Sequence, residues 1–250
     1  MANKRALNEQ LILSLIHDQR REHPRIGGRK LYFLIAADLQ KAGIKMGRDK
    51  FFELLARNAL LVKRRRKYVY TTDSFHRFRV YKNLLKHQLL SGAHQGWVAD
   101  ITYIRTDKDF LYLFLITDAY SRKIVGWHLS ESLKIAGAIS ALKMAIKQCR
   151  QTTGLIHHSD RGIQYCSKDY VNLLKKANIQ ISMTEENHCY ENATAERVNG
   201  ILKQEYGLDE TFSSQRQGLK AVREAIWSYN MNRPHWSLKL ATPHQVHQAA

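Results

Sequence analysis

The feature that most constrains this chain is a change of hydrophobic pattern at residue 96. Three β-rich runs, WVADITYIRT, FLYLFLITDAY and KIVGWHLSES, follow one another with short turns between them. Helical and β-rich segments then alternate: a helix over 135–151, the strand LIHHS, a helix near 170–177, the strand IQISM, and helices near 191–206 and 216–230. This order predicts an α/β domain over 96–250, a mixed sheet flanked by helices.

The first third of the chain reads as helical throughout. Apolar residues recur at helical spacing over 7–16 and 29–41, and Gly43 ends the second segment. A turn over 44–47 leads to a third helix over 48–58, an arrangement typical of a helix-turn-helix. The second helix of such a pair presents its N-terminal residues to bases, here Arg48 and Lys50. We therefore predict a small all-α helix-turn-helix domain over 1–61; an ordinary helical bundle is the alternative.

Positive charge is concentrated in the same third. The chain has 40 Lys+Arg against 22 Asp+Glu, a net charge of +18, and residues 1–90 account for +14 of it. A basic block of this size points to a polyanion, most often nucleic acid. Five consecutive cations at 63–67 repel each other and will not pack into a core. We interpret 62–95 as a basic linker that lies along a phosphate backbone; a solvated loop is the alternative.

Several protein classes are excluded by composition. The longest apolar run, near 110–117, is shorter than the roughly 20 residues that a membrane span needs. The N-terminal segment has no signal-peptide pattern, and Cys149, Cys166 and Cys189 form no CxxC pair. We expect a cytoplasmic protein with no membrane partner, no disulfide framework and no cysteine-rich zinc site.

Three carboxylates stand at chemically suggestive places. Asp100 interrupts the apolar pattern of a strand, and sequences tend to break local rules at functional sites. Asp160 directly follows the strand LIHHS, at the edge of an α/β sheet where ligands collect, and Glu196 lies on a helix. Carboxylates from separate elements suit hard divalent cations in phosphodiester chemistry. Each acid alone also fits a structural role: an edge-strand solubiliser, a turn residue or an exposed acid.

One face of the helix near 191–206 supports this interpretation. Asn192, Glu196, Asn199 and Lys203 recur at helical spacing and share a stripe. Lys203, two turns from Glu196, is placed to meet a phosphate that flanks the reacting one. A polar stripe that merely faces solvent is the alternative.

Longer motifs carry a family resemblance. The segments HHSDRGIQY, NHCYENATAERVNGILKQEY and YNMNRPHWSLKLATPHQV resemble the transposase, the second-reading-frame product, of the insertion-sequence-three family. That family belongs to the DDE recombinases with a retroviral-integrase-like core. Between Asp160 and Glu196 lie 35 residues, Lys203 is seven further on, and Asp100 matches the first aspartate. At 190–191 the chain has Tyr-Glu where the family commonly has Trp-Asp, for which we expect altered loop packing only.

The resemblance implies a fold, an activity and partners. It implies an RNase H-like core in which Asp100, Asp160 and Glu196 are catalytic and bind two Mg²⁺ or Mn²⁺ ions. The reaction would be 3′-end cleavage of the insertion sequence followed by strand transfer into DNA. Double-stranded DNA, as terminal inverted repeats and as target, would be the substrate of a homodimer or larger assembly. An upstream-frame product would be a further partner or a fusion to this chain, and the setting would be the bacterial cytoplasm, in association with the nucleoid.

The expected DNA contacts draw on all of these segments. They are Arg48, Lys50, Lys63, Arg64, Arg65, Arg66, Lys67, Arg161, Asn192, Asn199 and Lys203. Other residues near the motifs allow two roles, contact with substrate or packing in the core; these are His158, Tyr165, Arg233, His235 and Trp236. For the last three we favour docking of the C-terminal segment.

Two other functions compete with the transposase. One is a helix-turn-helix regulator or structural DNA protein whose α/β part has no catalysis. The other is an RNase H-type nuclease for RNA–DNA hybrids, which the basic N-terminal third makes less favoured.

Overall fold

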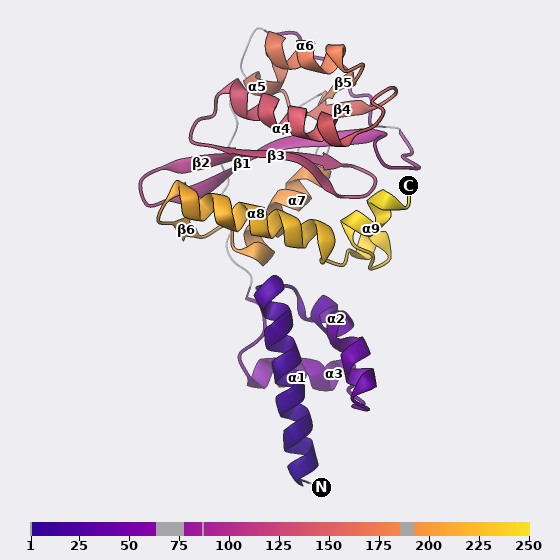
Figure 1. The fold of residues 1–250 in the computed structure, drawn as a ribbon, viewed down its shortest axis with the longest axis vertical. Helices are drawn as coiled ribbons and strands as arrows, with labels where there is room; N and C mark the ends of the chain where they lie inside the picture. Colours follow the sequence, from indigo (N-terminus) through magenta and orange to yellow (C-terminus); the bar gives the residue numbers. More distant parts are fainter. Residues whose placement is uncertain (1, 64–77, 87, 186–192) are drawn as a thin grey trace. The chain divides into compact units, whose positions relative to one another are not determined.

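A computed structural model describes residues 2–63, 78–86, 88–185 and 193–250 (Figure 1). The contacts within the chain group it into two compact units. One unit comprises residues 1–68 with 204–207, and the other comprises 69–203 with 208–250.

The first unit is built from helices. Its apolar core consists of one face of each helix, with Ile16, Leu31, Ile35, Phe51 and Leu55 fully buried. The helices are α1 (Ala2–Glu22), α2 (Gly28–Lys41) and α3 (Arg48–Arg57). Gly43, at φ +67°, lets the chain turn sharply after α2. The helical segments expected from periodicity are therefore confirmed.

The second unit contains one mixed sheet. Its main strands are β1 (Gly96–Thr106), β2 (Phe110–Asp118), β3 (Ile124–Ser130), β4 (Ile156–Ser159) and β5 (Gln180–Met183). Their order is β3-β2-β1-β4-β5, with β1, β2 and β3 antiparallel and β4 and β5 parallel to β1. A short β6 (Thr211–Phe212) pairs with the end of β1. The predicted mixed α/β sheet is confirmed.

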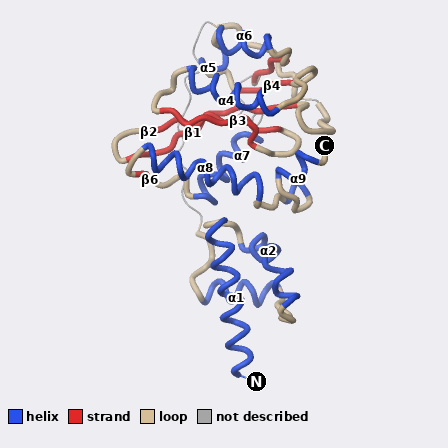
Figure 2. Tube along the Cα trace, viewed as in Figure 1, coloured by secondary structure: helices blue, strands red, loops and turns tan. Residues whose placement is uncertain are grey.

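Helices cover both faces of this sheet (Figures 1 and 2). On one face lie α4 (Ile135–Gln148), α5 (Ile163–Cys166) and α6 (Lys168–Lys176); on the other lie α7 (Ala193–Tyr206) and α8 (Gln215–Met231). Trp97, Phe114, Leu142 and Tyr170 belong to the buried core under α4 and α6. The sheet and α4 approach closely at Gly126, where an added Cβ would lie 2.3 Å from the carbonyl oxygen of Ala141.

Four short elements were not expected from the sequence. They are α5, β6, the 3₁₀ turn η2 (Trp236–Leu238) and α9 (Pro243–Gln248). Segments of two to six residues are too short to show a hydrophobic period. A local signal did exist for α9, because Thr242 and Gln245 form a capping box and Pro243 occupies the first turn.

Candidate active site

Strand register brings Asp100 and Asp160 together. Strands β1 and β4 are parallel, and Val98 of β1 pairs with His158 of β4. Two residues further along, Asp100 in β1 and Asp160 directly after β4 occupy equivalent positions. Because side chains alternate between the two faces of a sheet, both carboxylates lie on the same face as Val98 and His158. That face is the one covered by α7.

Helix α7 directs polar side chains at this pair. The amide nitrogen Nδ2 of Asn199 donates a hydrogen bond of 2.6 Å to Oδ2 of Asp100, and Asn199 is only 7% exposed. Glu196 is exposed and Lys203 is half-buried, and each acts electrostatically on Asp100. The buried apolar face of α7 consists of Val198, Ile201 and Leu202.

Burial and neighbouring charge perturb Asp100 strongly. Burial first, and then the charge of Asp160, raise the pKa of Asp100 from 3.8 to about 7, with a smaller contribution from Glu196. Hydrogen bonds from the backbone of Ile101 and from Asn199 act in the opposite direction. Burial lowers the pKa of Lys203, while Asp100 and Asp209 raise it. The site therefore gathers more negative charge than its surroundings neutralise.

The loop after β4 supports Asp160. The backbone N–H of Gly162 donates to Oδ1 of Asp160 at 2.9 Å, and a Cβ at Gly162 would lie 2.9 Å from the same oxygen. Glycine at this position thus permits the close approach of the backbone to the Asp160 carboxylate. Nε of Arg161 donates to the carbonyl oxygen of Thr184 at 2.6 Å, so part of that side chain is held by the main chain.

The carboxylates suit a hard cation without forming a closed ligand set. Within the residues that the structure describes, no three or more His, Cys, Asp or Glu side chains are grouped so that they could hold a metal ion. The donor chemistry nevertheless fits a divalent cation, because oxygen ligands share one face, where burial and then the charge of Asp160 raise the pKa of Asp100. The catalytic and metal-binding roles of Asp100, Asp160 and Glu196 stay predictions.

Apart from Arg161, which the carbonyl oxygen of Thr184 holds, the expected DNA contacts fall into three groups. Arg48, Lys50 and Lys63 are exposed, and Nε of Arg48 lies 3.0 Å from Oδ1 of Asp49. Asn199 and Lys203 face Asp100. Outside the described residues lie Arg64, Arg65, Arg66, Lys67 and Asn192. Contact of any of these residues with DNA stays a prediction.

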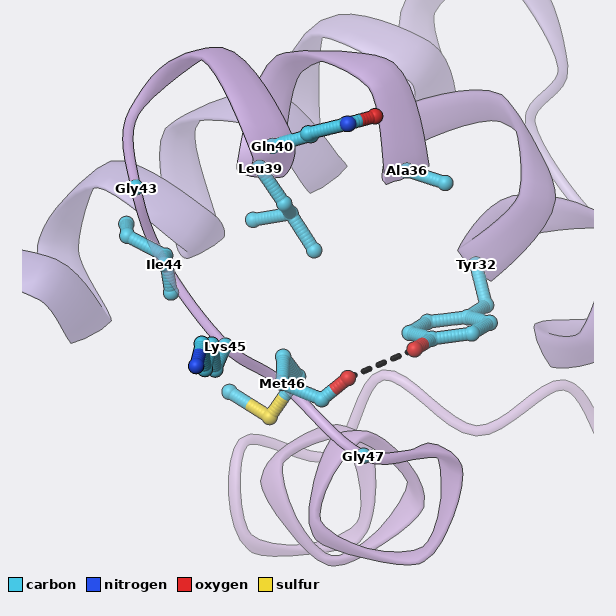
Figure 3. A pocket seen from close by; sticks show the side chains of 9 residues that line it. All are labelled: Tyr32, Ala36, Leu39, Gln40, Gly43, Ile44, Lys45, Met46 and Gly47. Carbon is cyan, nitrogen blue, oxygen red and sulfur yellow. Dashed lines mark hydrogen bonds between the residues drawn. The ribbon is translucent and has the colours of Figure 1, made fainter.

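A pocket of about 510 Å³ lies beside the turn that joins α2 to α3 (Figure 3). Tyr32 and Leu39 line it from α2, and Met46 lines it from the turn. The hydroxyl of Tyr32 donates a hydrogen bond to the carbonyl oxygen of Met46, which ties the turn to α2. Of the expected DNA contacts that the structure describes, none lines this pocket, so we do not include it in the candidate site.

Most of the residues for which the sequence allowed either substrate contact or core packing are buried in the core. His158 is fully buried, with Nδ1 2.8 Å from Oγ of Ser182. Tyr165, Arg233 and His235 are also buried, whereas Trp236 is 57% exposed. Burial of Arg233 and His235 agrees with docking of the C-terminal segment.

Sequence reasoning missed one contact beside the site. Arg122, in the turn between β2 and β3, donates from Nη1 to Oγ1 of Thr194 at 2.7 Å. No local pattern signals it, because the two residues are 72 positions apart.

Comparison with known proteins gives a consistent result. Residues 91–189 match a family described as "Integrase core domain", and residues 177–243 match a second family with the same description. The "Insertion element IS600 uncharacterized 31 kDa protein" of Shigella sonnei is 34% identical over 244 residues, which cover 97% of this chain and 88% of that protein. "Transposase InsF for insertion sequence IS3A" of Escherichia coli K12 is 37% identical over 176 residues, 70% of this chain and 60% of InsF.

Solved structures share the fold. The HTLV-2 integrase catalytic core in complex with magnesium, in its trimeric form, has a TM-score of 0.50 at 20% identity; the match covers 63% of this chain and 98% of that one. A simian T-cell lymphotropic virus intasome chain, in complex with the PP2A regulatory subunit B56 gamma, has a TM-score of 0.55 at 19% identity. This match covers 90% of this chain and 75% of that one.

The integrase-core matches and the RNase H-like sheet define this protein as a DDE recombinase. Similarity over almost the whole chain is more specific: the chain belongs to the IS3 family of insertion-sequence transposases. The family resemblance and the transposase activity inferred from the sequence are thereby confirmed. Membership implies that the chain acts on DNA and that its chemistry depends on a divalent metal. No helix in the described parts of the chain is both long enough and apolar enough to span a membrane.

Proposed function

We propose that the chain cleaves the 3′ ends of its insertion sequence and transfers them into target DNA, using Mg²⁺ or Mn²⁺. One observation carries the proposal: two aspartates lie at equivalent positions of parallel strands, on the face that α7 covers with Glu196 and Lys203. Polynucleotidyl transfer needs acidic ligands from separate elements beside a cation that meets phosphate.

The position of each residue in the site gives it a separate role in this proposal. Asp100, Asp160 and Glu196 would hold two ions, which supply activation of the attacking oxygen and stabilisation of the leaving oxygen when bound. Glu196 is exposed, and its three rotatable side-chain bonds let its carboxylate adjust without backbone movement. Lys203 lies two helical turns away, where its ammonium group meets a flanking phosphate.

Two displacements at phosphorus make up the reaction. In cleavage, water attacks the phosphodiester at the element end, and the 3′ oxygen of the element leaves as a hydroxyl. In strand transfer, that 3′-hydroxyl attacks a target phosphodiester and displaces the 3′ oxygen of the target strand. Neither step requires a covalent bond between protein and DNA.

The first unit supplies DNA recognition in this proposal. The exposed Arg48 and Lys50 in the first turn of α3 read the terminal inverted repeats, and the five cations at 63–67 contact the phosphate backbone. Synapsis of two ends requires a homodimer or larger assembly. The chain matches 60% of the length of InsF, and an upstream-frame product would add a further DNA-binding segment, in the bacterial nucleoid.

Cleavage of oligonucleotide duplexes that carry the element ends tests the proposal. We expect Asp160→Asn and Glu196→Gln to abolish cleavage and strand transfer in Mg²⁺ and in Mn²⁺, while binding of the ends stays near the parent level. Glu131→Gln, an exposed acid just after β3, is the matched control and should keep full activity. Strand transfer retained by either site variant would disprove the assigned roles.

The same experiment separates the competing functions. Binding of the ends by the parent protein without metal-dependent nicking would favour a helix-turn-helix regulator. Faster cleavage of RNA–DNA hybrid than of duplex DNA would favour an RNase H-type nuclease.

A further inference from the structure

Two hydrogen bonds flank Glu196 on α7. Before it, Oγ1 of Thr194 accepts from Nη1 of Arg122 at 2.7 Å. After it, Nδ2 of Asn199 donates to Oδ2 of Asp100 at 2.6 Å. Both partners lie outside α7, Arg122 in the turn after β2 and Asp100 in the middle of β1. The stretch of helix that carries Glu196 is thus tied to the sheet at both ends.

Apolar packing alone would not fix the direction of Glu196. The buried residues Val198, Ile201 and Leu202 hold α7 against the sheet by an attraction that has no preferred direction. A slip of one residue along the helix axis turns a side chain by about 100°. Hydrogen bonds are directional. One bond before Glu196 and one after it therefore set the rotation of α7 about its axis and its position along β1.

Arg122, which donates the first of these hydrogen bonds, is itself held in place by its neighbours. Arg122 has a positive φ of 65°, and its carbonyl oxygen accepts from the hydroxyl of Tyr229 at 2.9 Å. In the same turn, Oδ1 of the buried Asp118 accepts from both the backbone N–H and the hydroxyl of Ser121, at 2.8 and 2.7 Å. The guanidinium of Arg122 therefore extends from a fixed point of the core.

Packing against the sheet does not by itself explain an asparagine at position 199. Its Oδ1 is buried and has no hydrogen-bond partner in the described part of the chain. A buried, unsatisfied carbonyl oxygen costs stability, which a leucine of similar size would avoid. An amide at this position is accounted for by the bond that its other atom makes to Asp100.

We propose that Arg122 and Asn199 are positioning residues that hold α7 in register, so that Glu196 is presented to Asp100 and Asp160. The inference rests on the proposed function, because it assigns these two residues to the placement of the third carboxylate. Neither residue takes part in the reaction itself.

Near-isosteric variants test the two bonds separately. Thr194→Val removes the acceptor for Arg122 and keeps the side-chain shape, whereas Thr194→Ser keeps the hydroxyl. Asn199→Leu removes the donor to Asp100 at similar volume. Arg197→Ala, on the exposed face of the same helix, is the control.

The first measurement needs neither metal nor DNA. Amide hydrogen exchange of α7 should accelerate by about fivefold in Thr194→Val and in Asn199→Leu, since each loses one hydrogen bond that opposes local opening. Thr194→Ser and Arg197→Ala should exchange at the parent rate. Unchanged exchange in both Thr194→Val and Asn199→Leu would overturn the proposal.

The second measurement is the Mn²⁺ concentration that gives half-maximal cleavage of the element ends. Loss of a residue that orients a metal ligand commonly costs 10–100-fold in metal affinity, so Thr194→Val and Asn199→Leu should need at least about tenfold more Mn²⁺. Thr194→Ser should restore the parent requirement. Faster exchange with an unchanged Mn²⁺ requirement would overturn the positioning role. If the parent protein shows no metal-dependent cleavage, the proposed function fails, and hydrogen exchange still decides whether the two bonds hold α7.

Discussion

Asp100 and Asp160 repel each other across two neighbouring strands, so removal of one charge should stabilise the metal-free protein. The pKa of Asp100 rises from 3.8 to about 7. Each pKa unit corresponds to about 1.4 kcal/mol, so the combined penalty at high pH is at most about 4 kcal/mol. Burial is the largest cause and Asp160 the second, so Asp160→Asn should recover less than half of this penalty, on the order of 1–2 kcal/mol.

The pH at which this gain appears follows from linkage. The pKa of Asp100 is higher in the folded protein than in the unfolded chain, so the folded state holds the proton more tightly. Stability therefore falls as pH rises from about 4 to about 7, and the penalty is complete above pH 7. Asp160→Asn lowers the pKa of Asp100, so its gain should be absent near pH 4 and full near pH 8. The asparagine oxygen still accepts the N–H of Gly162.

Thermal unfolding in EDTA measures the effect. For a chain of this length, 1–2 kcal/mol corresponds to a rise in Tm of roughly 2–8 °C at pH 8. Glu131→Gln should show no such pH-dependent gain. Added Mg²⁺ should raise the Tm of the parent protein more than that of Asp160→Asn, because the variant has lost a ligand. A Tm change that is equal at pH 4.5 and pH 8, or a loss at pH 8, would refute the reasoning.

Three further outcomes test the fold and the DNA-binding segment. Gly126→Ala should lower the free energy of unfolding by about 1–3 kcal/mol in a urea titration, since its Cβ would clash with the backbone of α4; an unchanged midpoint would contradict the close packing. Tyr170→Phe should cost about 1 kcal/mol by the same titration, because it breaks a buried 2.9 Å bond to His157, and an unaffected variant would show that this bond adds no stability. Alanine at each of Arg64, Arg65 and Arg66 should flatten the log–log salt dependence of DNA affinity by about 0.9 for each phosphate that is no longer neutralised, whereas an unchanged slope would place these residues away from DNA.

The candidate site stores unfavourable charge in an otherwise well-packed domain. The sheet around Asp100 buries Trp97, Ala99, Ile104 and Leu115, each at most 3% exposed, and this packing tolerates one destabilised carboxylate. Such local penalties are expected where a binding site must be ready for a cation before it arrives. Stability gained by Asp160→Asn should therefore accompany loss of cleavage.

Local pattern by itself determined the helices of the first third and the β-rich runs of the core, and it marked the three acids only as candidates. The alternation of apolar and polar residues along β1 and their helical spacing along α7 involve residues two to four positions apart. Both patterns can therefore be recognised in the sequence without a structure. The spacing of Asp160, Glu196 and Lys203 and the flanking motifs identified the family, which the comparisons then confirmed.

Only the tertiary structure decided which of these residues meet. Asp100 and Asp160 are 60 positions apart, and their adjacency follows from the parallel pairing of β1 with β4. Asn199, which the sequence suggested for DNA, is buried against Asp100, and Arg122 reaches Thr194 across 72 positions. Pairing between distant segments is set by the burial and hydrogen bonding of the whole domain, because no property of either segment alone selects its partner.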